Sequence, residues 1–162
     1  MSTRLSKITA TAASGVLLVL VALNNVFDYG VNHDVVRHIL AMDKIPASPF
    51  GWRAITHPAA HHILYFGIIA AEFAAGFAML FGVIRLWAKR AAPAPVFNAA
   101  KSLAVAGVAG GFMLYFFGFM VVGGEWFQMW RAGPYNMQEP AFRFIGAFGL
   151  VLIFLSLPDQ DD

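Results

Sequence analysis

The sequence predicts an all-α integral membrane protein: an antiparallel four-helix transmembrane bundle that forms a single transmembrane domain over residues 1–162. Composition is the first observation behind this prediction, because 59% of the residues are hydrophobic and only 12% are charged. Soluble domains carry about 25% charged residues. The second observation is that the apolar residues gather in four runs, each close to the roughly 20 residues that a helix needs to cross a bilayer.

The four apolar runs that we predict to be transmembrane helices cover residues 8–27, 61–86, 102–122 and 141–157. The first run follows Arg4 and Lys7 and exceeds the usual apolar core of a signal peptide, so we interpret it as a retained span, with cleavage as the alternative. The second is long enough to cross with a tilt. The fourth is the shortest, and a buried half-span is its alternative interpretation, although Pro140 and Pro158 mark helix-like limits around it.

Basic residues that flank the runs predict the orientation of the bundle. One group precedes the first run or surrounds the connection between the second and third runs: Arg4, Lys7, Arg85, Lys89, Arg90 and Lys101. The basic residues of the other two connections are offset there by acidic residues. Because Lys and Arg are enriched in cytoplasmic loops, we predict a multi-pass protein of a bacterial inner membrane with both termini in the cytoplasm.

The first connection, residues 29–60, is the longest. Val31, Val35 and Ile39 recur in it at helical spacing, with polar residues between them. This pattern predicts a partly helical first outer connection that lies on the membrane boundary or packs over the bundle. The second connection is shorter, and its segment 91–95, which is rich in Ala and Pro, is typical of a stiff turn between antiparallel helices.

Small residues recur at close to helical spacing in three of the runs. They are Gly67, Ala71 and Ala75 in the second run, Gly107, Gly111 and Gly118 in the third, and Gly146 and Gly149 in the fourth. Small faces of this kind let helix backbones approach closely inside a membrane. They favour a tight bundle; the alternative is that Gly and Ala merely fill apolar sequence.

Glu72 lies roughly 15 Å into the second run, near the membrane midplane. An ionised carboxylate at that depth costs at least about 2.5–3.5 kcal/mol, so we predict a neutral Glu72 that is hydrogen-bonded inside the bundle. On a helical projection it shares a stripe with His61 and Tyr65, and Tyr115 of the third run lies close to it in depth. These four residues form a candidate intramembrane polar site, which either handles a proton or ligand or only fixes helix packing.

A second candidate cluster directly follows the third run. It consists of Glu125, Trp126, Gln128, Trp130 and Arg131. Tryptophan is typical of the headgroup level of a membrane, which makes an aromatic anchor one interpretation. The polar residues among the tryptophans favour the other interpretation, a cluster that closes the outer mouth of the bundle or docks a partner. If the helix continues outward, Trp126 and Trp130 share one face.

Several functional classes find no support in the residues. The chain has no cysteine, and all 5 histidines belong to the first connection or the outer end of the second run. His57 and His61 have a spacing that could hold a metal, but Pro58 suits a first helical turn with His57 as its cap. We therefore expect no metal site and no catalytic residue. We expect no cofactor either, with a lipid or quinone possible, and no nucleic acid partner, because the basic residues form only short clusters.

Three segments of the sequence resemble a known family. They are Gly-Gly-Glu-Trp-Phe-Gln-Met-Trp at residues 123–130, Ala-Ile-Thr-His-Pro-Ala-Ala-His at residues 54–61, and Phe-Asn-Ala-Ala-Lys at residues 97–101. They are similar to the predicted small integral membrane proteins grouped as domain of unknown function 2165. The resemblance covers nearly the whole chain and implies four spans, but it carries no activity with it.

The leading hypothesis from the sequence is a non-enzymatic role: an accessory or structural subunit of a larger inner-membrane complex, respiratory or photosynthetic. Its expected partners are membrane lipids and other integral membrane subunits. One alternative is a small proton-coupled transporter or channel-like oligomer that uses Glu72. The other is a protein that binds a quinone, lipid or pigment among the aromatic third and fourth spans.

Overall fold

The structure is a computed structural model that describes residues 2–161. All of its regular elements are helices, and these residues contain no strand. Four helical segments are long and apolar enough to cross a membrane: Ser2–Phe27, Pro58–Ala88, Ser102–Trp126 and Gly133–Ser156. The four predicted runs lie within these segments, apart from Leu157 directly after the last one. The prediction of an all-α transmembrane bundle is therefore confirmed, and the fourth run is a full candidate span.

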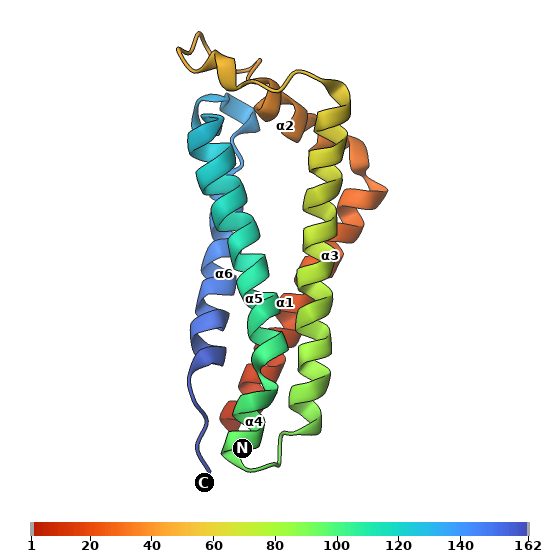
Figure 1. Ribbon diagram of the computed structural model, residues 1–162, viewed down its shortest axis with the longest axis vertical. Helices are drawn as coiled ribbons and strands as arrows, with labels where there is room; N and C mark the ends of the chain where they lie inside the picture. The colour runs from red at the N-terminus through yellow and green to blue at the C-terminus, as the bar shows by residue number, and fades with distance from the viewer. Residues whose placement is uncertain (1, 162) are drawn as a thin grey trace.

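The spans are antiparallel neighbours along the chain (Figure 1). Helix α1 (Ser2–Phe27) packs against α3 (Pro58–Ala88), and α3 packs against α5 (Ser102–Met113). Helix α5 continues into the segment η2 (Leu114–Trp126), and both pack against α6 (Gln138–Ser156). We call the end of the bundle that holds both termini and the short helix α4 (Ala94–Ala100) the terminal end, and the opposite end the cap end.

The first connection is partly helical, as predicted. Its helix α2 (Tyr29–Ala41) begins directly after α1 and crosses the cap end of the bundle (Figure 1). It stops at Met42, which adopts a left-handed conformation with φ 53°. Three single-turn 3₁₀ segments complete this end: η1 (Gly51–Arg53), η3 (Met129–Arg131) and η4 (Gly133–Tyr135). A small apolar core beneath them joins Ile39 and Leu40 of α2 to Phe127 and Met129.

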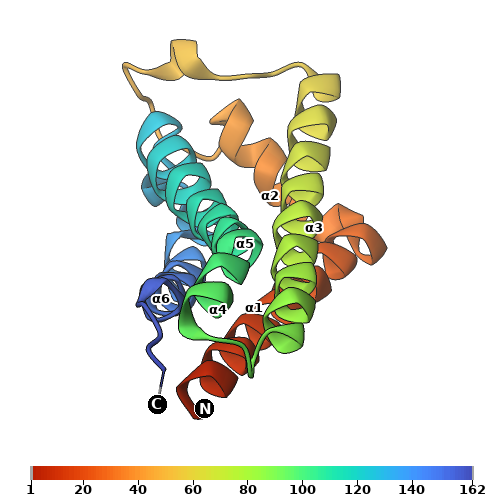
Figure 2. The same cartoon turned by 60° about the horizontal axis from the view of Figure 1, so that its bottom comes forward.

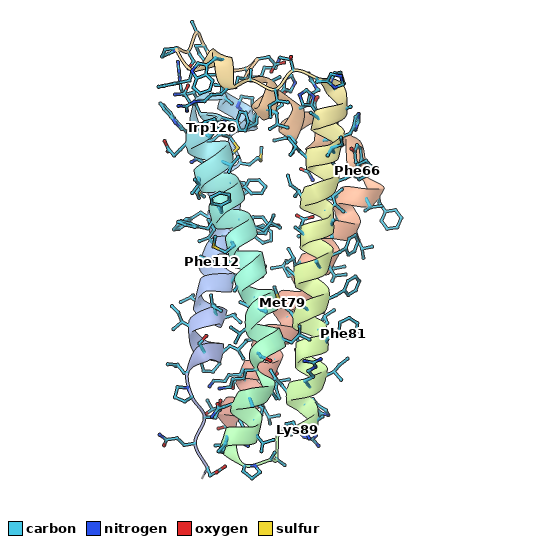
Figure 3. All side chains as sticks on the ribbon, viewed as in Figure 1. Phe66, Met79, Phe81, Lys89, Phe112 and Trp126 are labelled. Atoms are coloured by element: carbon cyan, nitrogen blue, oxygen red, sulfur yellow. The ribbon has the colours of Figure 1, made fainter. Side chains whose placement is uncertain are left out.

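Backbone-to-backbone contact holds the spans together in the half of the bundle near the termini. A Cβ added to Gly82 of α3 would lie 2.6 Å from the backbone of Ala104 in α5. One added to Gly107 of α5 would lie 2.6 Å from the backbone nitrogen of Met79. Figure 3 shows Met79 on the side of α3 that faces α5, whereas Phe81 points outward.

The predicted small-residue faces are only partly correct. Gly107, Gly111 and Gly149 do lie against a neighbouring helix. Gly67, Gly118 and Gly146 were predicted to do so, but a Cβ at any of these positions would meet nothing within 4 Å. The reason is that the buried stripe of α3 is the one that contains Glu72, and Gly67 lies on another side of the helix.

The second half of the third span has an unusual helical form. From Leu114 to Trp126 the backbone is a π-helix, in which each N–H bonds to the carbonyl five residues earlier, and Phe127 N closes the last such turn on Val122 O at 3.0 Å. The sequence did not predict this segment. The helix then stops, because Gln128 has a left-handed φ of 54°. The expectation that Trp126 and Trp130 share one continuing helix is therefore wrong.

A buried ionic cluster closes the terminal end. The Asp159 carboxylate accepts hydrogen bonds from Lys7 Nζ at 2.8 Å and from Lys101 Nζ, and both ammonium groups also donate to Leu157 O. Asn98 adds two hydrogen bonds to the backbone of Asp159, both at 2.9 Å. We call these five residues the C-terminal latch. It joins the chain after α6 to α1 and to the α4–α5 junction.

Candidate functional site

Glu72 is a buried acidic residue of α3 and is only 2% exposed. Its Oε2 accepts a hydrogen bond from Asn25 Nδ2 of α1 at 2.8 Å, and its Oε1 accepts one from the Tyr115 hydroxyl of η2 at 3.3 Å. Asn32 Nδ2 of α2 donates to the side-chain oxygen of Asn25, Oδ1, at 2.6 Å. The Tyr65 hydroxyl donates to the backbone carbonyl oxygen of Asn25 at 3.3 Å. We call these five residues the Glu72 network. It ties α1, α2, α3 and η2 together.

The structure separates the four residues of the predicted polar site. Glu72 and Tyr115 are in direct contact, and Tyr65 reaches Asn25 rather than Glu72. His61 takes no part, because it lies about three helical turns from Glu72 and its Nε2 donates to Ile55 O at 2.7 Å. A stripe on a helical projection places residues on one side of a helix, but it does not bring distant turns together.

Sequence reasoning missed the two asparagines of the Glu72 network. Asn25 is buried near the end of the first apolar run, and Asn32 belongs to the polar face of α2. One feature of the sequence could have identified Asn25. It is a polar amide near the end of an apolar run, where a helix that faces lipid would carry an apolar residue. The pattern alone did not indicate which residue of another helix Asn25 meets.

The hydrogen bonds leave the Glu72 network with a donor to spare. If Glu72 is neutral, its carboxyl group and the Tyr115 hydroxyl carry two donor hydrogens between them. They share a single contact, at 3.3 Å, so one of the two hydrogens is left over whichever group donates. Asn25 donates to Glu72 as well, and does not accept from it. In this neutral form the network offers a hydrogen to an acceptor that enters beside it.

Two adjoining cavities lie beside the Glu72 network. The first, the polar cavity, has a volume of about 210 Å³ and is lined by Asn25, Asn32, Tyr65, Glu72, Tyr115 and apolar side chains. The second, the apolar cavity, has a volume of about 450 Å³ and lies between α2, α3 and η2. Four residues line both cavities: Val35, Val36, Ile68 and Phe119. Figure 2 shows α3 diverging from the third span toward the cap end, with α2 lying in the angle between them.

An aromatic column forms one wall of the polar cavity. The Tyr115 ring stacks on Phe144 of α6 with 4.3 Å between centroids and an angle of 6° between planes. On its other side it stacks on Phe119, 5.4 Å away. All three rings line the polar cavity. This wall is therefore aromatic, with the Tyr115 hydroxyl as its polar group.

The predicted outer cluster divides into two groups with different environments. Gln128 and Arg131 fasten the first connection to the third: Gln128 Oε1 accepts from Ser48 Oγ at 2.6 Å and from Arg131 Nη1 at 3.1 Å, and Arg131 Nη2 donates to Pro46 O at 3.1 Å. Glu125, Trp126 and Trp130 are exposed instead. Two residues of the cluster therefore hold the two connections together by hydrogen bonds, and the other three are exposed.

Trp126 belongs to a built surface at the cap end (Figure 3). Its ring meets Trp52 edge to face with 5.9 Å between centroids. The Arg53 guanidinium lies 4.5 Å from the Trp126 ring centroid and 4.2 Å from that of Phe50, and its Nη1 donates to Trp126 O at 3.1 Å. We call Phe50, Trp52, Arg53 and Trp126 the aromatic cap.

The histidines serve local structure. His57 caps α3 as predicted: its side chain accepts from Ala59 N at 3.2 Å, and Pro58 occupies the first turn. Within residues 2–161, no three His, Asp or Glu side chains are grouped as a metal site requires. The rings of His33 and His62 stack with centroids 4.2 Å apart where α2 meets α3. Burial, and then the neighbouring His62, lower the pKa of His33.

A protein-family model described as predicted small integral membrane protein, DUF2165, matches residues 3–158. The chain belongs to this family. The match covers all four spans and both cavities, so the fold and the Glu72 network lie within the DUF2165 region. That description gives a location in a membrane and no activity. Neither the comparison with curated proteins nor the comparison with solved structures found a match.

Proposed function

We propose that this DUF2165 protein is a non-catalytic accessory subunit that docks onto another integral membrane subunit through its aromatic cap. The observation that carries the proposal is the way the cap is built. Trp52 is 71% exposed and Trp126 is 46% exposed, yet both surround Arg53, which is hydrogen-bonded to the third connection. Exposed tryptophan and arginine dominate the binding energy of protein interfaces.

Rigidity distinguishes the cap from an ordinary membrane anchor. A headgroup anchor needs only tryptophans at the right depth, and it gains nothing from fixing one connection to another. Here three side chains, Ser48, Arg53 and Arg131, donate across the gap between the two connections. A surface that is ordered beforehand loses less conformational entropy when a partner binds, which favours a docking role.

The proposal places the aromatic cap on the outer side of a bacterial inner membrane and both termini in the cytoplasm. The terminal end carries the dense basic group that includes Arg85, Lys89 and Arg90. Reporter fusions after Lys7, Arg90 and Asp162 test this orientation. All three should report the cytoplasm, and a periplasmic signal at Arg90 would contradict the proposed topology.

The docking role is tested by purification at native expression level in a mild detergent, followed by identification of co-migrating proteins. The double variant Trp52→Ala/Trp126→Ala should lose a stoichiometric partner that the wild-type chain retains. Phe81→Ala is the matched control, because Phe81 is an aromatic residue that is 57% exposed on α3, away from the cap. A partner that remains bound to the double variant, or one lost equally from Phe81→Ala, would exclude the cap as the docking surface.

Proton-coupled transport remains a second candidate, supported by the hydrogen-bond chain from Glu72 through Asn25 to the exposed Asn32. Toward the terminal end, however, the bundle below Glu72 is filled by Leu18, Met79 and other side chains of zero exposure. A monomer therefore reaches Glu72 from one end only. Proton or solute flux through the pure protein in liposomes, abolished by Glu72→Gln, would favour the transporter over the accessory role.

A further inference from the structure

We propose that the polar and apolar cavities together bind a neutral amphipathic molecule of the quinone class. Its carbonyl-bearing ring would lie beside the Glu72 network, and its apolar chain would lie between α3 and η2. This site is distinct from the aromatic cap, so it does not depend on the docking role. The argument rests on the spare donor, the aromatic wall, the adjoining apolar volume and the charge of the lining.

The spare hydrogen-bond donor of the Glu72 network favours a ligand whose head group carries a neutral acceptor. With Glu72 neutral, its carboxyl group and the Tyr115 hydroxyl hold two hydrogens but share one contact, and both side chains line the polar cavity. A buried donor without a partner costs free energy, which an incoming acceptor recovers. A ring carbonyl accepts such a hydrogen without bringing charge into the membrane. An alkane or an acyl chain alone offers no acceptor and leaves the donor unpaired.

The aromatic wall and the apolar cavity select the rest of the molecule. Phe119, Tyr115 and Phe144 line the polar cavity with three aromatic rings, and a planar ring packs well against aromatic side chains, either face to face or edge to face. The apolar cavity begins at Phe119 and Ile68, which line both volumes, and it is enclosed almost wholly by aliphatic and aromatic side chains. Its 450 Å³ lies within the range of small-molecule sites, which are mostly apolar with a few placed polar groups.

The charge of the lining excludes the two obvious competitors. Among the residues that line the two cavities, Glu72 is the single ionisable acid and there is no Lys, Arg or His. A phospholipid head group would therefore find no cation for its phosphate. A cationic amphiphile would require an ionised Glu72, which is expensive at this depth. A neutral acceptor is the ligand that matches the site as it is built.

The proposal is tested with purified protein in lipid nanodiscs, titrated with a benzoquinone that carries a saturated alkyl chain. Two probes run in parallel: the same chain on a benzene ring without carbonyls, and the same chain on an ammonium group. We expect saturable binding of the quinone with one molecule per chain and at least tenfold weaker binding of the other two. Infrared spectra should show a shift of the quinone carbonyl band that is absent with Glu72→Leu/Tyr115→Phe, which lacks both hydroxyl donors.

Two variants separate the ring from the tail. The double variant Glu72→Leu/Tyr115→Phe removes both hydroxyl hydrogens of the Glu72 network, and it should weaken quinone binding about tenfold, which corresponds to about 1.4 kcal/mol. Glu72→Gln keeps a donor and should retain binding. Gly118→Leu should also weaken binding at least tenfold, because Gly118 lines the apolar cavity and an added Cβ meets nothing within 4 Å. Gly146→Leu is the matched control, since it is equally unhindered and lines neither cavity.

Each other outcome overturns the proposal. Equal affinity for the alkylbenzene shows a site for an acyl chain, and tighter binding of the alkylammonium shows a cation site with an ionised Glu72. Quinone uptake that is the same in wild type, Glu72→Leu/Tyr115→Phe and Gly118→Leu shows only partition into the bilayer. Thermal unfolding of Gly118→Leu and Gly146→Leu at the same temperature confirms that a loss of binding is not a loss of fold.

Discussion

The two halves of the bundle are built on different principles. In the half near the termini, Gly82 and Gly107 bring α3 and α5 into backbone contact, and the C-terminal latch closes the end. In the half near the cap, α3 diverges from η2, and α2 and two cavities occupy the space between them (Figure 2). Close packing is therefore concentrated away from the Glu72 network and the open volume.

With the proposals above, this contrast predicts that one half of the bundle supplies stability and the other half supplies binding. Close backbone approach gives many van der Waals contacts per residue, and it is the main source of helix association in a membrane. Cavities forgo such contacts and are destabilising unless something fills them. Substitutions in the two halves should accordingly differ in what they change, and the following predictions test that difference in order of expected size.

The largest effect is expected at Asp159 in the latch. Its side chain is 4% exposed and faces two ammonium groups, Lys7 and Lys101. Hydrogen bonds from both lysines outweigh the effect of burial and hold the pKa of Asp159 below its usual range. Asp159→Asn leaves two buried positive charges without a counter-charge, so it should cost about 3–5 kcal/mol of unfolding free energy, measured by chemical denaturation in detergent.

Lys101→Met provides the matched control for the latch. It leaves Lys7 and Asp159 as a balanced pair, and burial already lowers the pKa of Lys101, since burial disfavours its charged form. It should therefore cost much less than Asp159→Asn. If the two variants are equally destabilised, charge balance is not what the latch provides.

The next effect is expected where α3 and α5 touch. Gly82→Ala places a Cβ 2.6 Å from the Ala104 backbone, which cannot move aside as a side chain can. It should cost about 1–3 kcal/mol, the usual range for overpacking. Gly67→Ala is the control, because it meets nothing within 4 Å and improves helix propensity by up to about 1 kcal/mol. Thermal unfolding should move in opposite directions for the two variants.

At Glu72 the expected change in stability is smaller. Glu72→Leu removes the hydrogen bonds to Asn25 and Tyr115 and should cost about 1 kcal/mol, the scale of polar contacts between membrane helices. Glu72→Gln preserves the shape and should be tolerated. Infrared spectra should show a protonated carboxyl band in the wild type that vanishes in Glu72→Gln. An ionised Glu72 at neutral pH would contradict the predicted neutral state.

The smallest effect is a pH dependence where α2 docks on α3. The pKa of His33 is lowered by burial and by His62, with further contributions from His61 and Arg37, whereas Asp34 acts in the opposite direction. The undocked state therefore binds the proton more readily. Docking should be at full strength above about pH 6.5, the usual histidine value, and should weaken as the pH falls below it.

Amide hydrogen exchange of α2 at pH 7.5 and at pH 5.5 measures this effect. Exchange should accelerate at the lower pH in the wild type and should lose that dependence in His33→Gln. His57→Asn is the control, because Asn also caps a helix and the residue lies outside the α2–α3 contact. A pH dependence that survives His33→Gln would assign the effect to another group.

The sequence predicted the parts of the fold that depend on composition and period. Four apolar runs predicted the four spans, and the helical spacing of Val31, Val35 and Ile39 predicted α2. Pro58 and His57 predicted where α3 begins, because the geometry of a first helical turn depends only on the residues at that turn. Each of these features follows from residues that are neighbours along the chain.

What the sequence did not predict depends on which helices meet. Gly67 lies at the same spacing as true contact residues but on an exposed side of α3. Asn25 gains its role only because α1 ends beside Glu72. The π-helix of η2 carries no periodic marker in its apolar run. The aromatic cap joins residues 53 and 126, and nothing local to either connects them.

The latch also sets an order of events during synthesis. Lys7 and Asp159 are 152 residues apart, which a ribosome covers in about 8–30 s at 5–20 residues per second. For that time the Lys7 ammonium has no Asp159 to pair with, so it stays hydrated at the membrane surface and resists being drawn across. Its charge can thus hold the first span in place while the other three insert. Only when the last span is in place does the lysine become buried, and the charge that guided insertion then becomes part of the finished structure.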